Sequence, residues 1–142
     1  MRALGVDLGS KRIGIAVSDP SGTIASPLTV VHRSSSRRRD LDAIARIATD
    51  EDVDTIVVGL PLTMRGEVGQ AAEAAIAEAA RLATVVGVPV ETHDERLTTV
   101  TAERSMIDAG MRGEERRRVV DKVAAAVMLQ SWLDTRRARG ET

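Results

Sequence analysis

The sequence predicts an α/β protein built on a mixed five-stranded sheet flanked by helices. Two observations carry this prediction. Residues 3–32 read as strands joined by tight turns. From residue 37 onward the apolar period becomes helical, and short β-branched segments alternate with the helices. The resulting order, βββαβαβαα, gives three antiparallel strands followed by parallel crossovers.

The first three strands are expected at residues 3–8, 12–18 and 24–32. Isoleucine and valine alternate with other residues along the second of them, which is typical of a strand with one apolar face. Gly9-Ser10-Lys11 is typical of the turn of a β-hairpin, and Asp19-Pro20-Ser21-Gly22 favours a turn. Pro27 indicates an edge or a bulge in the third strand.

The second half alternates helices with short strands. Helices are expected at residues 37–51, 67–86, 98–110 and 114–137, and strands at 55–59 and 88–93. Gly87 and Pro89 end the long alanine-rich helix, and Thr98 is a candidate N-cap. Sheets of this kind form their sites at the carboxyl ends of the parallel strands.

The length of 142 residues predicts one domain, residues 1–142. The chain has no cysteine, which excludes disulfide scaffolds, thiolate zinc sites and cysteine nucleophiles. The longest apolar run, Val123–Leu129, is too short to cross a bilayer. We therefore expect a cytoplasmic protein with no membrane partner.

Basic and acidic residues nearly balance, 20 against 21, for a net charge of −1. This excludes nucleic-acid binding through bulk positive charge. Arginine dominates the basic residues and forms blocks at 37–39, 116–118 and 136–139. Such blocks suit bidentate phosphate contacts, and solvated helix faces are an equal alternative. Trp132 is the single aromatic residue, so base stacking is not expected.

Asp7 lies inside an apolar segment, where a charge without a partner is unfavourable. Strand alternation puts Gly5 and Gly9 on the same face as Asp7, and these glycines leave room beside the carboxylate. A functional carboxylate is indicated. The alternative is an ion pair between Asp7 and Arg12 across the hairpin.

Two further acidic positions are candidates. Asp94 and Glu95 follow the strand at 88–93, and alternation lets only one of them face the side of Asp7. Asp121 lies in an almost wholly apolar helical stretch, so its carboxylate needs a cation or a site. Ala125, one turn on, is small enough to let this helix approach the sheet. The alternative for Asp121 is an ion pair with an arginine of the block at 116–118.

These candidate carboxylates lie on the first strand, after a later strand and on the final helix. Such a set indicates a site for a hard metal ion. Oxygen ligands suit Mg²⁺ or Mn²⁺ rather than zinc. His32 and His93 lack zinc-ligand spacing, and a core or surface role is more typical for His93 than contact with the site. Residues 59–63 contain no P-loop lysine, so a nucleotide-binding loop of that kind is excluded.

Four segments resemble the YqgF/RuvX family, which is related to RuvC-type Holliday junction resolvases. They are VDLGSKRIGIAVSD (6–19), VVGLPLTMRGEVG (57–69), DERLTT (94–99) and DKVAAAVMLQ (121–130). Together they extend over most of the chain in the family's order. The resemblance implies a ribonuclease H-like fold and a metal-dependent nuclease, assigned in bacteria to maturation of the 5′ end of 16S ribosomal RNA.

The resemblance also implies the site. Asp7, Glu95 and Asp121 match the family's catalytic, metal-binding carboxylates, and Lys11 and Arg12 match a basic pair that we assign to phosphate contacts. We expect two ions, Mg²⁺ or Mn²⁺, about 3.5–4 Å apart at the scissile phosphate, with Asp7 shared between them. The products are then a 5′-phosphate and a 3′-hydroxyl.

The expected partner is nucleic acid, either a structured ribosomal precursor RNA or branched DNA. A Holliday junction resolvase-like DNA endonuclease is the first alternative to RNA processing, and a non-catalytic nucleic-acid binding module is the second. An ATPase of the actin-like fold is disfavoured, because such proteins need two domains. The sequence leaves open the choice between monomer and dimer.

Overall fold

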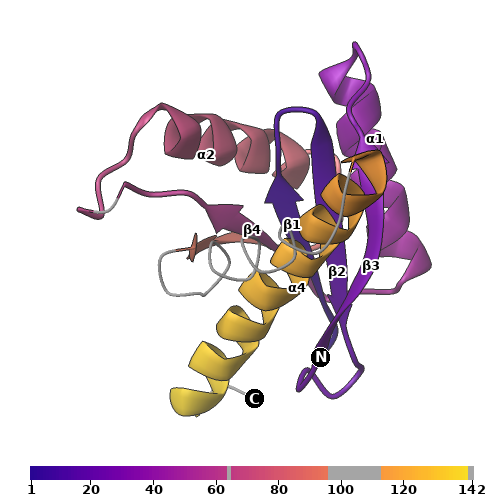
Figure 1. Cartoon of the computed structure of the whole chain (residues 1–142). Helices are drawn as coiled ribbons and strands as arrows, with labels where there is room; N and C mark the ends of the chain where they lie inside the picture. Colours follow the sequence, from indigo (N-terminus) through magenta and orange to yellow (C-terminus); the bar gives the residue numbers. More distant parts are fainter. Residues whose placement is uncertain (64, 96–112, 141–142) are drawn as a thin grey trace.

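The computed structural model describes residues 1–63, 65–95 and 113–140, with the backbone alone for residues 113–119. The strands are β1 (Ala3–Leu8), β2 (Arg12–Ser18), β3 (Ala25–His32), β4 (Thr55–Leu60) and β5 (Val90–Asp94), and the helices are α1 (Arg37–Asp50), α2 (Gln70–Ala83) and α4 (Gly113–Ala138). They form a five-stranded sheet of order β3-β2-β1-β4-β5 (Figure 1). The strands β1, β2 and β3 pair antiparallel, and β1, β4 and β5 pair parallel. The predicted mixed sheet is confirmed.

Most element boundaries agree with the prediction to within one or two residues, and α2 differs more. It begins at Gln70, because Glu67 belongs to a turn in which its N–H donates to the Thr63 hydroxyl at 3.0 Å. It ends at Ala83, and residues 85 and 86 donate back to the Leu82 carbonyl. The expected helix at 98–110 and its N-cap Thr98 lie outside the described residues.

Helices cover the sheet on both faces. One face packs against α1 and α2, and its core includes Val6 and Ile15 of the sheet with Ile44 and Leu82 of the helices. The other face packs against α4, which crosses β1, β2, β3 and β4 (Figure 1). None of the helices in the described residues is both long enough and apolar enough to span a membrane.

Helix α4 lies unusually close to the sheet because the strands carry small residues beneath it. A Cβ placed on Gly5 would lie 2.9 Å from Leu129 Cβ and 3.2 Å from the Ala125 carbonyl oxygen. A Cβ on Gly14 would lie only 2.1 Å from the carbonyl oxygen of Asp121. The contacts at 121, 125 and 129 recur every four residues, so one stripe of the helix rests on the glycines. The predicted close approach at Ala125 is confirmed.

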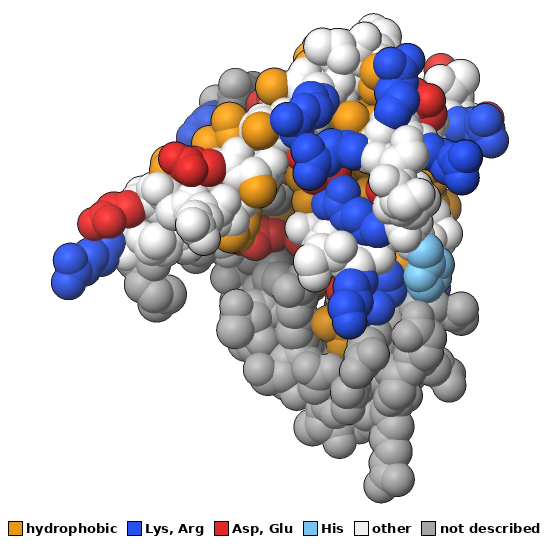
Figure 2. All heavy atoms as spheres, turned by 90° about the horizontal axis from the view of Figure 1, so that it is seen from above, with side chains coloured by type: hydrophobic (Ala, Val, Ile, Leu, Met, Phe, Trp, Pro, Cys, Tyr) orange, Lys and Arg blue, Asp and Glu red, His pale blue; other side chains and the backbone are white. Residues whose placement is uncertain are grey.

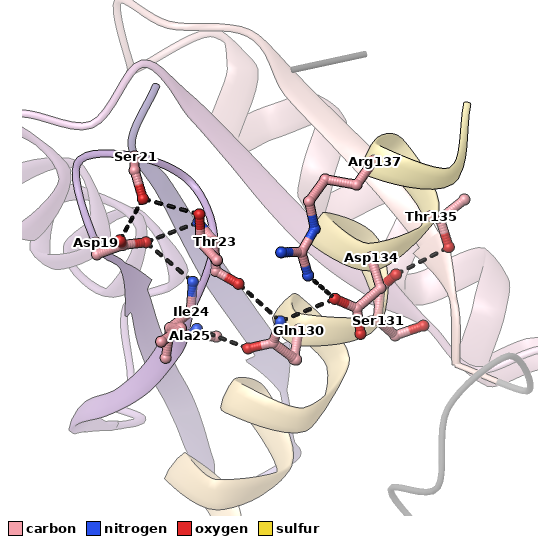
Figure 3. A network of polar contacts seen from close by, with 10 residues as sticks. All are labelled: Asp19, Ser21, Thr23, Ile24, Ala25, Gln130, Ser131, Asp134, Thr135 and Arg137. Atoms are coloured by element: carbon pink, nitrogen blue, oxygen red, sulfur yellow. Dashed lines mark hydrogen bonds and ion pairs between the residues drawn. The ribbon is translucent and has the colours of Figure 1, made fainter. Parts of the chain in front are cut away.

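The second half of α4 is tied to the turn between β2 and β3. Gln130 accepts a hydrogen bond from the Ala25 N–H at 2.8 Å and donates to the Thr23 carbonyl at 2.9 Å (Figure 3). The turn is itself ordered by Asp19, which accepts from the N–H of Ile24, the hydroxyl of Ser21 and the N–H of Thr23. These hydrogen bonds lower the pKa of Asp19 to about 2. The network fixes α4 lengthwise along the sheet, and with it the position of Asp121.

Candidate active site

Asp7 lies near the carboxyl end of β1 and is 9% exposed. On one side its pairing partner in β2 is Gly14. On the other side the parallel register pairs Val6 with Val58, which places Gly59 of β4 next to Asp7. Residues opposite one another in neighbouring strands project to the same face. The carboxylate therefore stands between two positions that carry no side chain.

Each of these glycines is covered by an element that carries a predicted acidic residue. Over Gly14 lies the backbone of α4 at Asp121, as the contact of 2.1 Å shows. Over Gly59 lies the side chain of Glu95, whose Oε1 would be 2.5 Å from a Cβ at that position. Neighbouring strands are about 4.8 Å apart. Asp7, Glu95 and Asp121 thus border one patch on the α4 face of the sheet, with Asp7 on the strand between the other two.

The carboxylates border this patch without forming a closed set of ligands. Among the described residues, no group of three or more histidine and acidic side chains is close enough to hold a metal ion as it stands. Asp121 is engaged elsewhere: Arg12 Nε donates to its Oδ2 at 2.7 Å, and both side chains are more than four-fifths buried. A positive charge already neutralises one of the three acidic groups.

The pair between Arg12 and Asp121 was missed by sequence reasoning. The sequence alternatives paired Arg12 with Asp7, and Asp121 with the arginine block at 116–118, whose side chains lie outside the described residues. Arg12 and Asp121 are 109 positions apart, so local spacing carries no signal for them. The pair forms because β2 and α4 cross at Gly14, next to β1.

The basic pair of the hairpin lies at the same end of the sheet. Lys11 is exposed in the turn between β1 and β2, and Arg12 opens β2. Figure 2 shows this end of the molecule from above, where Lys and Arg side chains gather around a hollow in which acidic side chains are visible. The net charge of −1 therefore conceals a local concentration of cations beside the candidate site.

His93 pairs with Gly59 across β4 and β5, so it projects to the same face of the sheet as Asp7, at the β5 edge of the patch. Its Nε2 lies 3.0 Å from the Ser131 hydroxyl, under the second half of α4, and the side chain is buried. Burial lowers the pKa of His93, which favours the neutral ring. The interpretation of His93 as a core residue agrees with this position.

Known proteins match this chain over most of its length. A model of the family described as "RuvX: Holliday junction resolvase" matches residues 1–135. A protein of Myxococcus xanthus (strain DK1622) named "Putative pre-16S rRNA nuclease" is 47% identical over 137 residues, which are 96% of this chain and 90% of that protein. A protein of Clostridium novyi (strain NT) with the same name is 42% identical over 135 residues, which are 95% of this chain and 99% of that protein.

Among solved structures, RuvC of Thermus thermophilus in complex with a Holliday junction substrate has a TM-score of 0.60 to this chain. The similarity covers 99% of this chain and 98% of that one, at 17% sequence identity. At this identity the likeness shows a shared fold, which is ribonuclease H-like.

Proposed function

Because this chain belongs to the RuvX family, we propose that it is a nuclease that hydrolyses phosphodiester bonds of nucleic acid at the patch bordered by Asp7, Glu95 and Asp121. One observation supports this placement above the others. A buried aspartate on the central strand is flanked by two glycines, and each glycine is covered by an element with another carboxylate. A pure binding surface for phosphates gains nothing from such a concentration of negative charge.

The donor set of this patch fits a hard divalent cation. All three side chains offer carboxylate oxygens, which Mg²⁺ and Mn²⁺ prefer. Gly59 leaves room for the carboxylate of Glu95 beside Asp7, and Gly14 leaves room for the backbone of α4 at Asp121. Asp7, Glu95 and Asp121 would hold such ions through their carboxylate oxygens. Bound metal supplies an activated water and neutralises charge at the scissile phosphate.

The chain's own residues then orient the substrate. Lys11 and Arg12 lie on the hairpin beside Asp7, where their positive charges attract and hold the phosphates next to the bond that is cleaved. Burial of Asp7 under α4 keeps water from competing for its oxygens, so its electrostatic interactions are stronger than on the surface. The hydrogen bonds of Gln130 fix helix α4 along the sheet, and this keeps Asp121 in its position over the sheet.

The precursor of 16S ribosomal RNA, at its 5′ end, is the substrate that we propose first. Relatives that are 42% and 47% identical to this chain over the aligned residues carry the name "Putative pre-16S rRNA nuclease". Such a role places the protein in the cytoplasm. A branched-DNA endonuclease is the second candidate, because the family model is described by Holliday junction resolution.

The function is tested by incubating the purified chain with a 16S precursor transcript and with a four-way DNA junction, each with Mn²⁺, Mg²⁺ or EDTA. We expect metal-dependent cutting of the RNA near the mature 5′ end, with 5′-phosphate products. Cutting of the junction alone moves the assignment to the resolvase. Binding of both without cutting in any metal contradicts the nuclease.

Arg12→Gln is expected to strengthen the binding of Mn²⁺ about tenfold. The guanidinium contacts Asp121 directly, and a hydrogen bond to a charged group contributes about 1.5–3 kcal/mol, so removing it frees a ligand. Isothermal titration of the metal-free protein measures the affinity. Lys11→Gln is the matched control, since it removes the same charge from the neighbouring, exposed position, and should change the affinity less than about threefold. Equal effects of the two variants contradict the role of the ion pair.

A further inference from the structure

A cavity of about 400 Å³ opens beside the carboxyl end of β1, on the side of the sheet that α2 covers. It begins at Leu8, the residue after Asp7, and continues along the Gly9-Ser10 turn. Because neighbouring residues of a strand project to opposite faces, the cavity and the carboxylate patch lie on the two sides of the same strand end. The volume is at the lower end of that of small-ligand sites, which suits a single nucleotide unit.

One wall of the cavity carries a fixed arginine. Arg33 donates from Nε to the Gly9 carbonyl at 2.9 Å and from both terminal nitrogens to the carboxylate of Glu78. Glu78 is 6% exposed, so the guanidinium is held against a buried partner. These bonds use three of the five N–H groups of the side chain. The other two N–H groups have no partner among the described residues. Because the side chain is already fixed, binding a ligand there costs little further conformational entropy.

The uncompensated charge of the cavity comes from Arg37. Glu78 neutralises Arg33, whereas Arg37 is exposed and has no ion pair within the described part of the chain. Arg37 is also the first residue of α1, where the helix dipole adds to the attraction of an anion. Ser10 adds a hydroxyl at the hairpin end. One net positive charge with these donors matches one phosphate diester.

Another part of the lining is apolar. It consists of Ala71, Ala74 and Ala75, on the same face of α2 as Glu78, together with Pro61 after β4. Their short side chains leave the space open where longer ones would fill it. A sugar or a base ring packs against such a surface without needing a specific hydrogen bond. The combination of a phosphate-binding end and an apolar wall is the chemistry of a nucleotide.

We propose that this cavity binds one nucleotide of the substrate strand, next to the phosphate that is cleaved. The phosphate of that nucleotide contacts Arg37, the remaining N–H groups of Arg33 and the Ser10 hydroxyl, and its sugar or base packs on the alanines. The proposal rests on the proposed function, because the strand reaches the cavity by passing over the end of β1 from Asp7. Specificity there is for a single strand, since a paired base has no free ring to place in a cavity.

The test measures the binding of a fluorescent single-stranded RNA of twelve nucleotides to Asp7→Asn protein in Mg²⁺, by anisotropy. Ala74→Leu fills the cavity from an exposed helix position and is expected to weaken binding at least about fivefold. Arg37→Gln is expected to weaken it similarly and to reduce the slope of log affinity against log salt by about 0.7. Arg38→Gln is the matched control, because Arg38 is the next residue of α1 and pairs with Asp42 on the surface. It should change the affinity less than twofold.

The same substitutions in the otherwise unaltered protein separate this proposal from the nuclease assignment. We expect Ala74→Leu to raise KM for the precursor RNA and to leave kcat within about twofold. Suppose that the unaltered protein cuts RNA, while the Ala74→Leu and Arg37→Gln variants bind RNA as tightly as the Arg38→Gln variant does. The cavity proposal is then wrong and the nuclease assignment stands. If nothing is cut while these two variants alone weaken binding, the cavity proposal stands and the nuclease is wrong. Equal weakening by Arg37→Gln and Arg38→Gln shows general attraction and overturns the cavity proposal.

Discussion

Replacing Asp7 with asparagine is expected to lower kcat at least about 1,000-fold while the fold stays intact. The carboxylate is the central member of the proposed ligand set, between Gly14 and Gly59. Loss of metal-ion catalysis removes several kcal/mol of transition-state stabilisation, and every 1.36 kcal/mol corresponds to a factor of ten. Asparagine keeps the shape of the side chain and removes the charge, so the change is electrostatic.

Stability should change much less than activity. Asparagine has nearly the volume of aspartate and fits the same buried position between Gly14 and Gly59. We therefore expect the free energy of unfolding of Asp7→Asn, measured with urea in EDTA, to stay within about 1.5 kcal/mol of that of the unaltered protein. Asp50→Asn, at an exposed position at the end of α1, is the control for both measurements. Cleavage by Asp7→Asn at more than a tenth of the normal rate rules out the proposed site.

Replacing Gly14 with alanine is expected to destabilise the protein by about 3 kcal/mol or more and to abolish cleavage as well. The added methyl group would lie 2.1 Å from the carbonyl oxygen of Asp121. This oxygen belongs to the backbone, so no side-chain rotation can relieve the clash. Relief requires α4 to lift from the sheet. That movement opens the core beneath Ala125 and Leu129 and carries Asp121 away from Asp7.

Gly87→Ala is the matched control for this prediction. A Cβ at Gly87 meets no atom within 4 Å, so the same chemical change there acts only on the unfolded chain. It should leave stability unchanged or raise it by less than about 1 kcal/mol. Urea unfolding followed by circular dichroism compares the two variants. A Gly14→Ala protein as stable as Gly87→Ala contradicts the close contact between α4 and β2.

The local patterns of the sequence were sufficient for the sheet. Period-two alternation, the turn at Asp19–Gly22 and the change of period after residue 36 predicted the strands to within one or two residues, because these signals act between near neighbours. The beginning of α2 was wrong by three residues. The turn that displaces it depends on a hydrogen bond from Glu67 back to Thr63, which alanine periodicity does not reveal.

Sequence patterns alone predicted the class of fold and the positions of Asp7 and Asp121, because an acidic residue inside an apolar strand or helix stands out from its own neighbours. Glu95 was preferred to Asp94 through the resemblance to the family. The surroundings of these positions depend on the tertiary structure. The glycines that flank Asp7 belong to two other strands, and the partner of Asp121 is 109 residues away. The cavity likewise joins the β1–β2 turn to Arg37 and α2. Contacts of this kind arise from strand register and from the crossing of α4 over the sheet, which are properties of packing between distant segments and leave no periodic trace in the sequence.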